Sequence, residues 1–285
     1  MVSLPKDAAK PRHTGKTRAR APLLIAFGLI GCFGTPTPLA PGVRGSVGLP
    51  YHGVLTNPVE LPVRGLGFQR YRPYGERNYG TRALVTAIAR AAARVQSEAT
   101  DSPPLVVGDL SAKWGGKVSG HASHRTGRDV DLLFYTTTLT GTPIRSPGFL
   151  HFGADTLART PEGNYVTLDI RRQWLLVRAL LEDPEIDVLW MFVSRDVEAY
   201  LIDHARSIGE PLDIVLKAER VLHQPRDSAN HDDHVHLRIG CTEAERVAGC
   251  SAGGPAWPWI SHPTGEEPEI FLPWDSSPIA EASRQ

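Results

Sequence analysis

The clearest pattern of apolar positions along the chain is a helical repeat in residues 81–97. Apolar residues recur there every three or four positions from Leu84 to Val95, which places them on one face of a helix. The hydroxyl of Thr81 is suited to accept a hydrogen bond from the first turn. The pattern predicts a helix with one buried face that begins just after Thr81.

Three further helices are predicted from the same period and from residues that end helices. One follows Asp169 and ends before Pro184, and two more end before Gly209 and Pro225. Short apolar runs typical of strands lie between the helices, at residues 105–107, 130–134, 186–193 and 235–239.

Helices and strands alternate along the chain without an internal repeat, but the segments that join them are long and irregular. This order favours an α+β fold over a doubly wound sheet. We expect a single domain with a central, mostly antiparallel sheet flanked by helices.

Composition supports a globular protein and excludes one class of partner. The chain has 285 residues, of which 41% are hydrophobic and 22% are charged. Lys and Arg number 31, as do Asp and Glu, so no overall basic charge points to nucleic acid. The sequence carries no signal for an oligomeric state.

The N-terminal 34 residues have the pattern of an export signal. Basic residues up to Arg20 precede an uncharged apolar run at residues 21–33, which is short for a membrane span. The run ends in Leu29-Ile30-Gly31-Cys32, which resembles the lipobox of bacterial lipoproteins. We expect residues 1–34 to direct export to the periplasm and Cys32 to become a lipid anchor. The alternative is an ordinary signal peptide with an incidental cysteine.

The rest of the chain divides by composition into three parts. Residues 35–63 are rich in Pro and Gly and are predicted as a tether, residues 64–250 as the folded domain, and residues 251–285 as an irregular tail. If Cys32 is lipidated, Cys241 and Cys250 remain as a pair. An oxidising compartment favours a disulfide between them over two free thiols.

Five of the eleven histidines fall in two short segments, GHASHRTGRDVD at residues 120–131 and NHDDHVH at residues 230–236. Imidazole nitrogens and carboxylate oxygens together are the usual ligands of a hydrolytic zinc site with one open position. Strand alternation puts Asp129 and Asp131 on one face of the first segment. In the second, it puts His234 and His236 on one face, together with Arg238.

These two segments resemble the penicillin-insensitive murein endopeptidase family, zinc peptidases related to D-Ala-D-Ala peptidases and lysostaphin-type enzymes. The resemblance covers residues 65–241. It implies that His124, Asp131 and His236 bind zinc, and that His121 is a candidate further metal contact. It also implies hydrolysis of D-Ala–diaminopimelate cross-links in peptidoglycan.

The resemblance further implies that His231 and His234 are catalytic, although the sequence does not say which of them is the general base. The family's later metal-binding loop corresponds to residues 161–165, where Glu162 and Tyr165 replace an Asp and a His. We therefore expect one zinc ion rather than two.

Several alternatives stay open from the sequence. One alternative is a carboxypeptidase that removes terminal D-Ala. Another is a non-catalytic wall-binding lipoprotein with a structural zinc closed by His121. Asp129 either orients a ligand imidazole or is a solvated turn residue. Arg125 and Arg238 either bind carboxylates of the wall peptide or form surface ion pairs.

Overall fold

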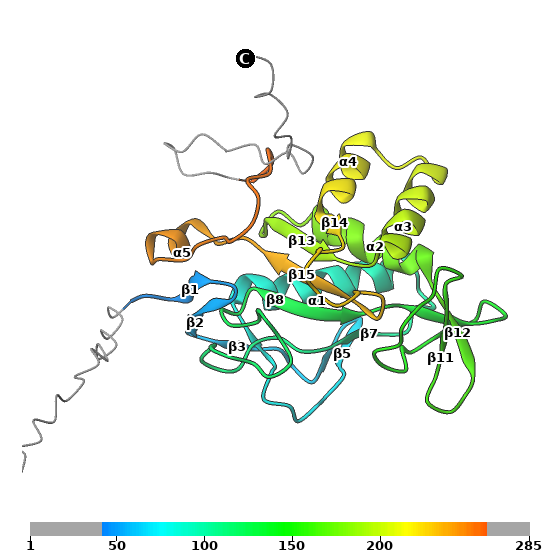
Figure 1. Ribbon diagram of the computed structural model, residues 1–285, viewed down its shortest axis with the longest axis horizontal. Helices are drawn as coiled ribbons and strands as arrows, with labels where there is room; N and C mark the ends of the chain where they lie inside the picture. Colours follow the sequence, from blue (N-terminus) through cyan, green and yellow to red (C-terminus); the bar gives the residue numbers. More distant parts are fainter. Residues whose placement is uncertain (1–41, 261–285) are drawn as a thin grey trace, which may run out of the picture. The chain divides into compact units, whose positions relative to one another are not determined.

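A seven-stranded sheet forms the centre of the computed structural model, which describes residues 42–260 (Figure 1). Most neighbouring strands are antiparallel, and only the β14–β13 and β7–β5 pairs are parallel, which confirms the predicted α+β fold. In spatial order the strands are β14 (Leu222–His223), β13 (Val188–Phe192), β15 (His234–Ile239), β8 (Asp129–Leu133), β7 (Leu105–Val107), β5 (Phe68–Arg70) and β4 (Arg64–Gly65).

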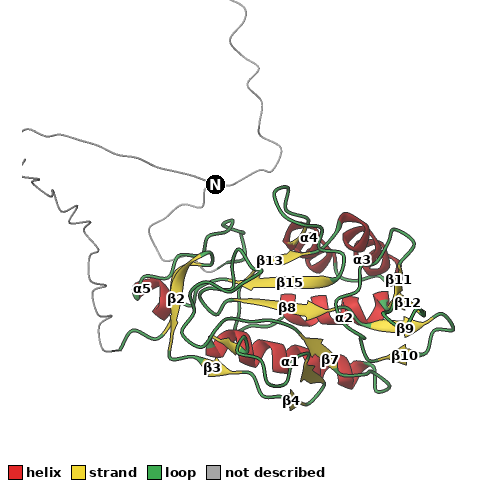
Figure 2. Ribbon diagram, turned by 60° about the horizontal axis from the view of Figure 1, so that its bottom comes forward, coloured by secondary structure: helices red, strands yellow, loops and turns green. Residues whose placement is uncertain are grey.

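Helix α1 lies behind strand β8 in Figure 1, and Figure 2 shows α1 and α2 on the same side of β8. Helix α1 begins where the apolar pattern predicts, because the Thr81 hydroxyl accepts a hydrogen bond from Leu84 N at 3.3 Å. Its apolar face is buried in the core. The helices are α1 (Arg82–Glu98), α2 (Ile170–Leu181), α3 (Arg195–Ser207), α4 (Leu212–Val221) and α5 (Glu243–Val247).

Three smaller sheets flank the central one. A four-stranded sheet has the order β10-β9-β12-β11, and two pairs join β1 to β2 and β3 to β6. Their bounds are β10 (Pro143–Ile144), β9 (Thr136–Thr138), β12 (Tyr165–Leu168), β11 (Leu157–Arg159), β1 (Gly45–Leu49), β2 (His52–Thr56), β3 (Val59–Glu60) and β6 (Tyr79–Gly80).

The second half of the predicted tether is part of the folded unit, which corrects the tether at residues 45–60. A Pro/Gly-rich composition is typical of a tether that does not fold by itself, but β1 and β2 form a hairpin there and β3 pairs with β6. Residues distant in sequence hold the hairpin: Ser46 N donates to Glu245 Oε1 at 3.0 Å, and Gly48 N donates to Gly249 O at 2.9 Å. Contacts between residues so far apart in the sequence cannot be predicted from local composition.

The buried side chain of Arg128 joins the hairpin to the centre and to the C-terminal segment. Its guanidinium donates to Ser46 Oγ, and to the carbonyls of Gly48, Ile239, Ser251 and Ala252. This side chain has no exposed surface, and burial lowers its pKa to about 10. One arginine thereby connects β1, β15 and the tail.

The C-terminal part of the described chain is held by two more contacts. Cys241 and Cys250 form the predicted disulfide. Residues 251–260 contain no helix or strand, but Trp257 is buried and its indole donates to Leu189 O at 2.8 Å. The predicted signal, Cys32 and the tail beyond residue 260 lie outside the described residues. Within residues 42–260, none of the helices combines the length and apolarity needed to cross a bilayer.

Candidate metal centre

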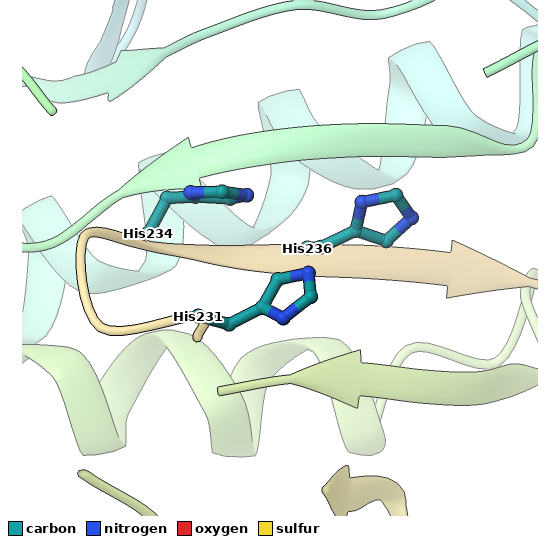
Figure 3. A group of neighbouring side chains, drawn as sticks. All are labelled: His231, His234 and His236. Atoms are coloured by element: carbon teal, nitrogen blue, oxygen red, sulfur yellow. The ribbon is translucent and has the colours of Figure 1, made fainter. Parts of the chain in front are cut away.

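The two histidine-rich segments meet on adjacent antiparallel strands at the centre of the sheet. In the register of β15 with β8, His236 stands opposite Asp131 and Arg238 stands opposite Asp129. His234 and His236 project from the same face of β15, with the helices behind the sheet, and His231 lies beside them on the preceding loop (Figure 3). The strand faces predicted from alternation are the faces observed.

Three atoms of this face form a nearly equilateral triangle. Asp131 Oδ1 lies 3.2 Å from both His124 Nε2 and His236 Nδ1, and these two nitrogens are 3.3 Å apart. Ligands held tetrahedrally at about 2.0–2.1 Å from a metal ion are separated by about 3.3 Å. The three atoms are therefore spaced as ligands of one ion would be.

The hydrogen bonds made by the rings of His124 and His236 leave one nitrogen of each ring unprotonated, as a metal ligand must be. His124 Nδ1 lies 3.1 Å from Leu110 O, and His236 Nε2 lies 2.9 Å from Asp129 Oδ1, so each of these nitrogens is the one that donates. The other nitrogen of each ring then presents its lone pair to the shared point. Asp131 Oδ1 is buried there and has no hydrogen-bond partner among the described residues. A cation would satisfy this orphaned oxygen.

Asp129 and Asp131 both stay ionised in the folded protein. Burial alone would raise the pKa of each, but Arg238 and His236 lower the pKa of Asp129, and His124 holds that of Asp131 well below its usual range. Among the described residues, Arg238 donates to Asp129, and no arginine or lysine donates to Asp131. Asp129 is therefore a buried hydrogen-bond partner of the candidate ligand His236 and not a solvated turn residue. Arg238 donates to Asp129 and is not on the surface.

His124 adopts an uncommon backbone conformation, with φ of 62°. Its carbonyl accepts a hydrogen bond from Ser111 Oγ at 2.6 Å, and the same hydroxyl accepts from Gly127 N at 2.8 Å. Gly127 has φ of 75°, and a Cβ there would meet Leu55 at 2.8 Å. Ser111 therefore fixes the loop that aims His124. Sequence analysis missed it because no chemical pattern distinguishes one serine from another.

His231 and His234 border the triangle in different electrostatic states. His234 Nε2 lies 3.3 Å from Asp131 Oδ1 and its Nδ1 lies 2.6 Å from Asp233 Oδ1. Burial opposes its charge, but these carboxylates raise its pKa to about 10. Burial and the neighbouring histidines lower the pKa of His231 to about 4, and its buried Nδ1 has no hydrogen-bond partner among residues 42–260. His231 is thus the neutral imidazole of the pair.

His121 lies at the edge of the cluster. Its Nδ1 is 3.8 Å from Asp131 Oδ2, and its Nε2 is 3.0 Å from Asp109 Oδ2. The loop at residues 161–165, which corresponds to the family's later metal-binding loop, leads into the four-stranded sheet: Tyr165 begins β12 and is 53% exposed. Among the described residues, two groups of side chains are close enough together to hold a metal ion: His121, His124 and Asp131, and His231, His234 and His236. Neither group includes Glu162 or Tyr165.

Comparison with known proteins gives one consistent match. A sequence profile described as penicillin-insensitive murein endopeptidase matches residues 46–257. The protein of that name from Haemophilus influenzae is 25% identical over 261 residues, covering 83% of this chain and 84% of the relative. That from Klebsiella pneumoniae is 26% identical over 230 residues, covering 76% and 77%. That from Escherichia coli is 26% identical over 255 residues, covering 85% and 86%.

Proposed function

The chain belongs to the penicillin-insensitive murein endopeptidase family, and we propose that it is a zinc-dependent endopeptidase that hydrolyses D-Ala–diaminopimelate cross-links of peptidoglycan. The family makes it a peptidoglycan hydrolase of the metalloendopeptidase class. The observation that carries the proposal is the triangle of His124 Nε2, Asp131 Oδ1 and His236 Nδ1, in which the buried Oδ1 has no hydrogen-bond partner among the described residues.

In this proposal His124, Asp131 and His236 hold one zinc ion. When bound, zinc supplies a Lewis acid that polarises the scissile carbonyl and lowers the pKa of a water molecule. Leu110 O and Asp129 fix the rings of the two histidines. His121 stays a predicted further contact: Asp109 holds its Nε2, which leaves Nδ1, 3.8 Å from Asp131 Oδ2, as the candidate ligand atom.

We assign the movement of protons to His231 and His234. His231 is neutral, and its Nδ1 has no hydrogen-bond partner among the described residues, so the ring is in the form that can act as a base. His234, whose pKa is raised by Asp131 and Asp233, is suited to donate a hydrogen bond to a developing oxyanion. Phe192 packs against the rings of His231 and His236, which excludes water from one side of the site.

The alternatives receive less support. A structural zinc closed by His121 would use Nδ1 of that ring, since Asp109 holds its Nε2, but the relatives are named as enzymes. Removal of terminal D-Ala would use the same chemistry, but the relatives are named endopeptidases. Product analysis separates the two activities: an endopeptidase converts dimeric muropeptides to monomers, whereas a carboxypeptidase releases only free D-Ala.

Chelation provides the direct test. Purified protein incubated with isolated peptidoglycan should convert dimeric muropeptides to monomers, as seen by chromatography of the released fragments. Activity should fall to background after treatment with a chelator and return when zinc is added back, because His124, Asp131 and His236 cannot polarise a carbonyl by themselves. Undiminished cleavage by metal-free protein would contradict the proposal.

A lipid anchor at Cys32 in the periplasm is proposed from the lipobox-like residues, with residues 1–34 as the export signal. Cys32→Ser should move the protein from the membrane fraction to the soluble periplasmic fraction, measured by immunoblotting after fractionation. Cys241→Ser in the disulfide is the matched control and should leave the membrane fraction unchanged. Retention of Cys32→Ser on the membrane would rule out this anchor.

A further inference from the structure

A cavity of about 310 Å³ lies next to the candidate metal centre, on the side of His121. Asp109 connects the two features, because its carboxylate lines the cavity and its Oδ2 lies 3.0 Å from His121 Nε2. None of the proposed zinc ligands or proton-transfer residues lines this cavity. Its lining consists of Arg72, Gly75, Glu76, Arg77, Asn78 and Asp109.

Two arginines give the cavity its chemistry. Nη1 of Arg72 and Nη1 of Arg77 each donate to a different oxygen of Asp109, both at 2.9 Å. A guanidinium has five N–H donors, and among the described residues neither group donates another hydrogen bond. Their side chains are 56% and 36% exposed, whereas that of Asp109 is 10% exposed. Most of their donors are therefore free to bind a ligand.

The backbone holds this pair close to the metal centre. Asp131 N donates to Asp109 O at 3.0 Å, so the residue that anchors both arginines is the direct backbone partner of a proposed zinc ligand. Leu110 N donates to Arg77 O at 2.7 Å, which ties the loop before β6 to the loop after β7. The two arginines are therefore connected to the metal centre through Asp109 and the backbone of Asp131.

The charges favour an anion. Asp109 is shared between Arg72, Arg77 and His121. One carboxylate does not neutralise two guanidinium groups, and the remaining acid of the lining, Glu76, is exposed and bonded to neither. Arginine binds carboxylates through paired N–H groups. Arg238, which the sequence offered for this role, is instead occupied by Asp129.

We propose that Arg72 and Arg77 form a subsite for a free carboxylate of the peptide substrate, next to the scissile amide. This inference rests on the proposed function. Diaminopimelate is a dicarboxylic acid, so its amino group in a D-Ala–diaminopimelate cross-link lies one carbon from a free carboxylate. Recognition of that carboxylate would distinguish a cross-link from other amides.

Two substrates test the subsite: a cross-linked peptide dimer with free carboxylates, and the same dimer with these converted to primary amides. Wild type should cleave the free form with roughly tenfold higher kcat/KM or more, as expected for charge-assisted hydrogen bonds. The double variant Arg72→Gln/Arg77→Gln should lose this preference through a raised KM for the free form, with kcat within about twofold.

Two further variants separate binding from structure. Arg90→Gln removes a comparable guanidinium, 42% exposed on the nearly buried Asp183, and should keep the wild-type preference. Arg72→Lys/Arg77→Lys keeps both positive charges beside Asp109, so it should retain part of the preference that the glutamine pair loses. If the lysine pair cleaves both dimers equally well, the preference does not come from the charge of these side chains and the subsite is wrong.

The outcomes also distinguish the subsite from the proposed function. Equal kcat/KM for the two dimers in wild type would overturn the subsite and leave the function standing. If wild type cleaves neither dimer, the function fails, and calorimetric binding of both dimers to chelator-treated protein decides the subsite. Tighter binding of the free form that disappears in Arg72→Gln/Arg77→Gln would then support it, and equal binding would overturn it.

Discussion

Replacing His236 by alanine is expected to reduce cleavage of murein cross-links by roughly a thousandfold or more, since the loss of several kcal/mol of transition-state stabilisation has that effect. His236 supplies one of three atoms spaced 3.2–3.3 Å apart. Its removal also leaves Asp129 without one of its two hydrogen-bond donors. Both the proposed zinc site and the charge balance behind it are lost.

A graded series gives this prediction its control. Asp129→Asn keeps all three proposed ligands but weakens the hydrogen bond that orients His236, so activity and zinc affinity should fall by about 10–100-fold. His204→Ala removes an imidazole on α3 and should have the activity of wild type. Zinc content by mass spectrometry and cleavage by chromatography are measured on the same samples. A His236→Ala protein with wild-type zinc content and activity would refute the ligand assignment.

The sequence predicts the elements whose pattern is local. Helix α1 repeats its apolar residues at the helical period and has Thr81 as a cap, so its start is found within one residue. Strands β8 and β15 are short apolar runs with polar residues on alternate positions, so alternation places Asp129 with Asp131 on one face of β8 and His234 with His236 on one face of β15. The register that sets His236 opposite Asp131 is seen only in the fold. The clustered histidines predict a metal site because ligation demands particular side chains, and the family resemblance implies the ligand set.

Elements held by distant contacts are not predictable in this way. The hairpin of β1 and β2 lies in Pro/Gly-rich sequence. Arg128 and Glu245 hold it through hydrogen bonds to Ser46, and both are more than 80 residues away from Ser46 in the sequence. Ser111, which fixes the backbone of His124, likewise acts through an ordinary hydroxyl. Pairing partners far along the chain have to be seen in the fold.

Arg128→Met should lower the free energy of unfolding by about 3–5 kcal/mol, because buried acceptors that lose their donors cost about 1–3 kcal/mol each. The side chain donates to one hydroxyl and four carbonyls, and has no exposed surface. Burying a guanidinium is itself unfavourable, as its lowered pKa indicates, and methionine relieves that cost. The loss of five hydrogen bonds outweighs this relief, and the melting temperature should fall by about 10 °C.

Arg206→Met is the matched control, because Arg206 is 61% exposed and pairs with Glu219 on the surface, where such a pair contributes at most about 1 kcal/mol. Arg128→Lys should fall between the two, since an ammonium keeps the charge but has only three donors. Thermal and urea unfolding measure all three variants. Hydrogen exchange should be faster in β1 and β2 of Arg128→Met than in wild type, because the hairpin loses its contact with Arg128. If Arg128→Met melts at or above the temperature of Arg206→Met, the cost of burying the charge exceeds the gain from its hydrogen bonds, and Arg128 does not stabilise the fold.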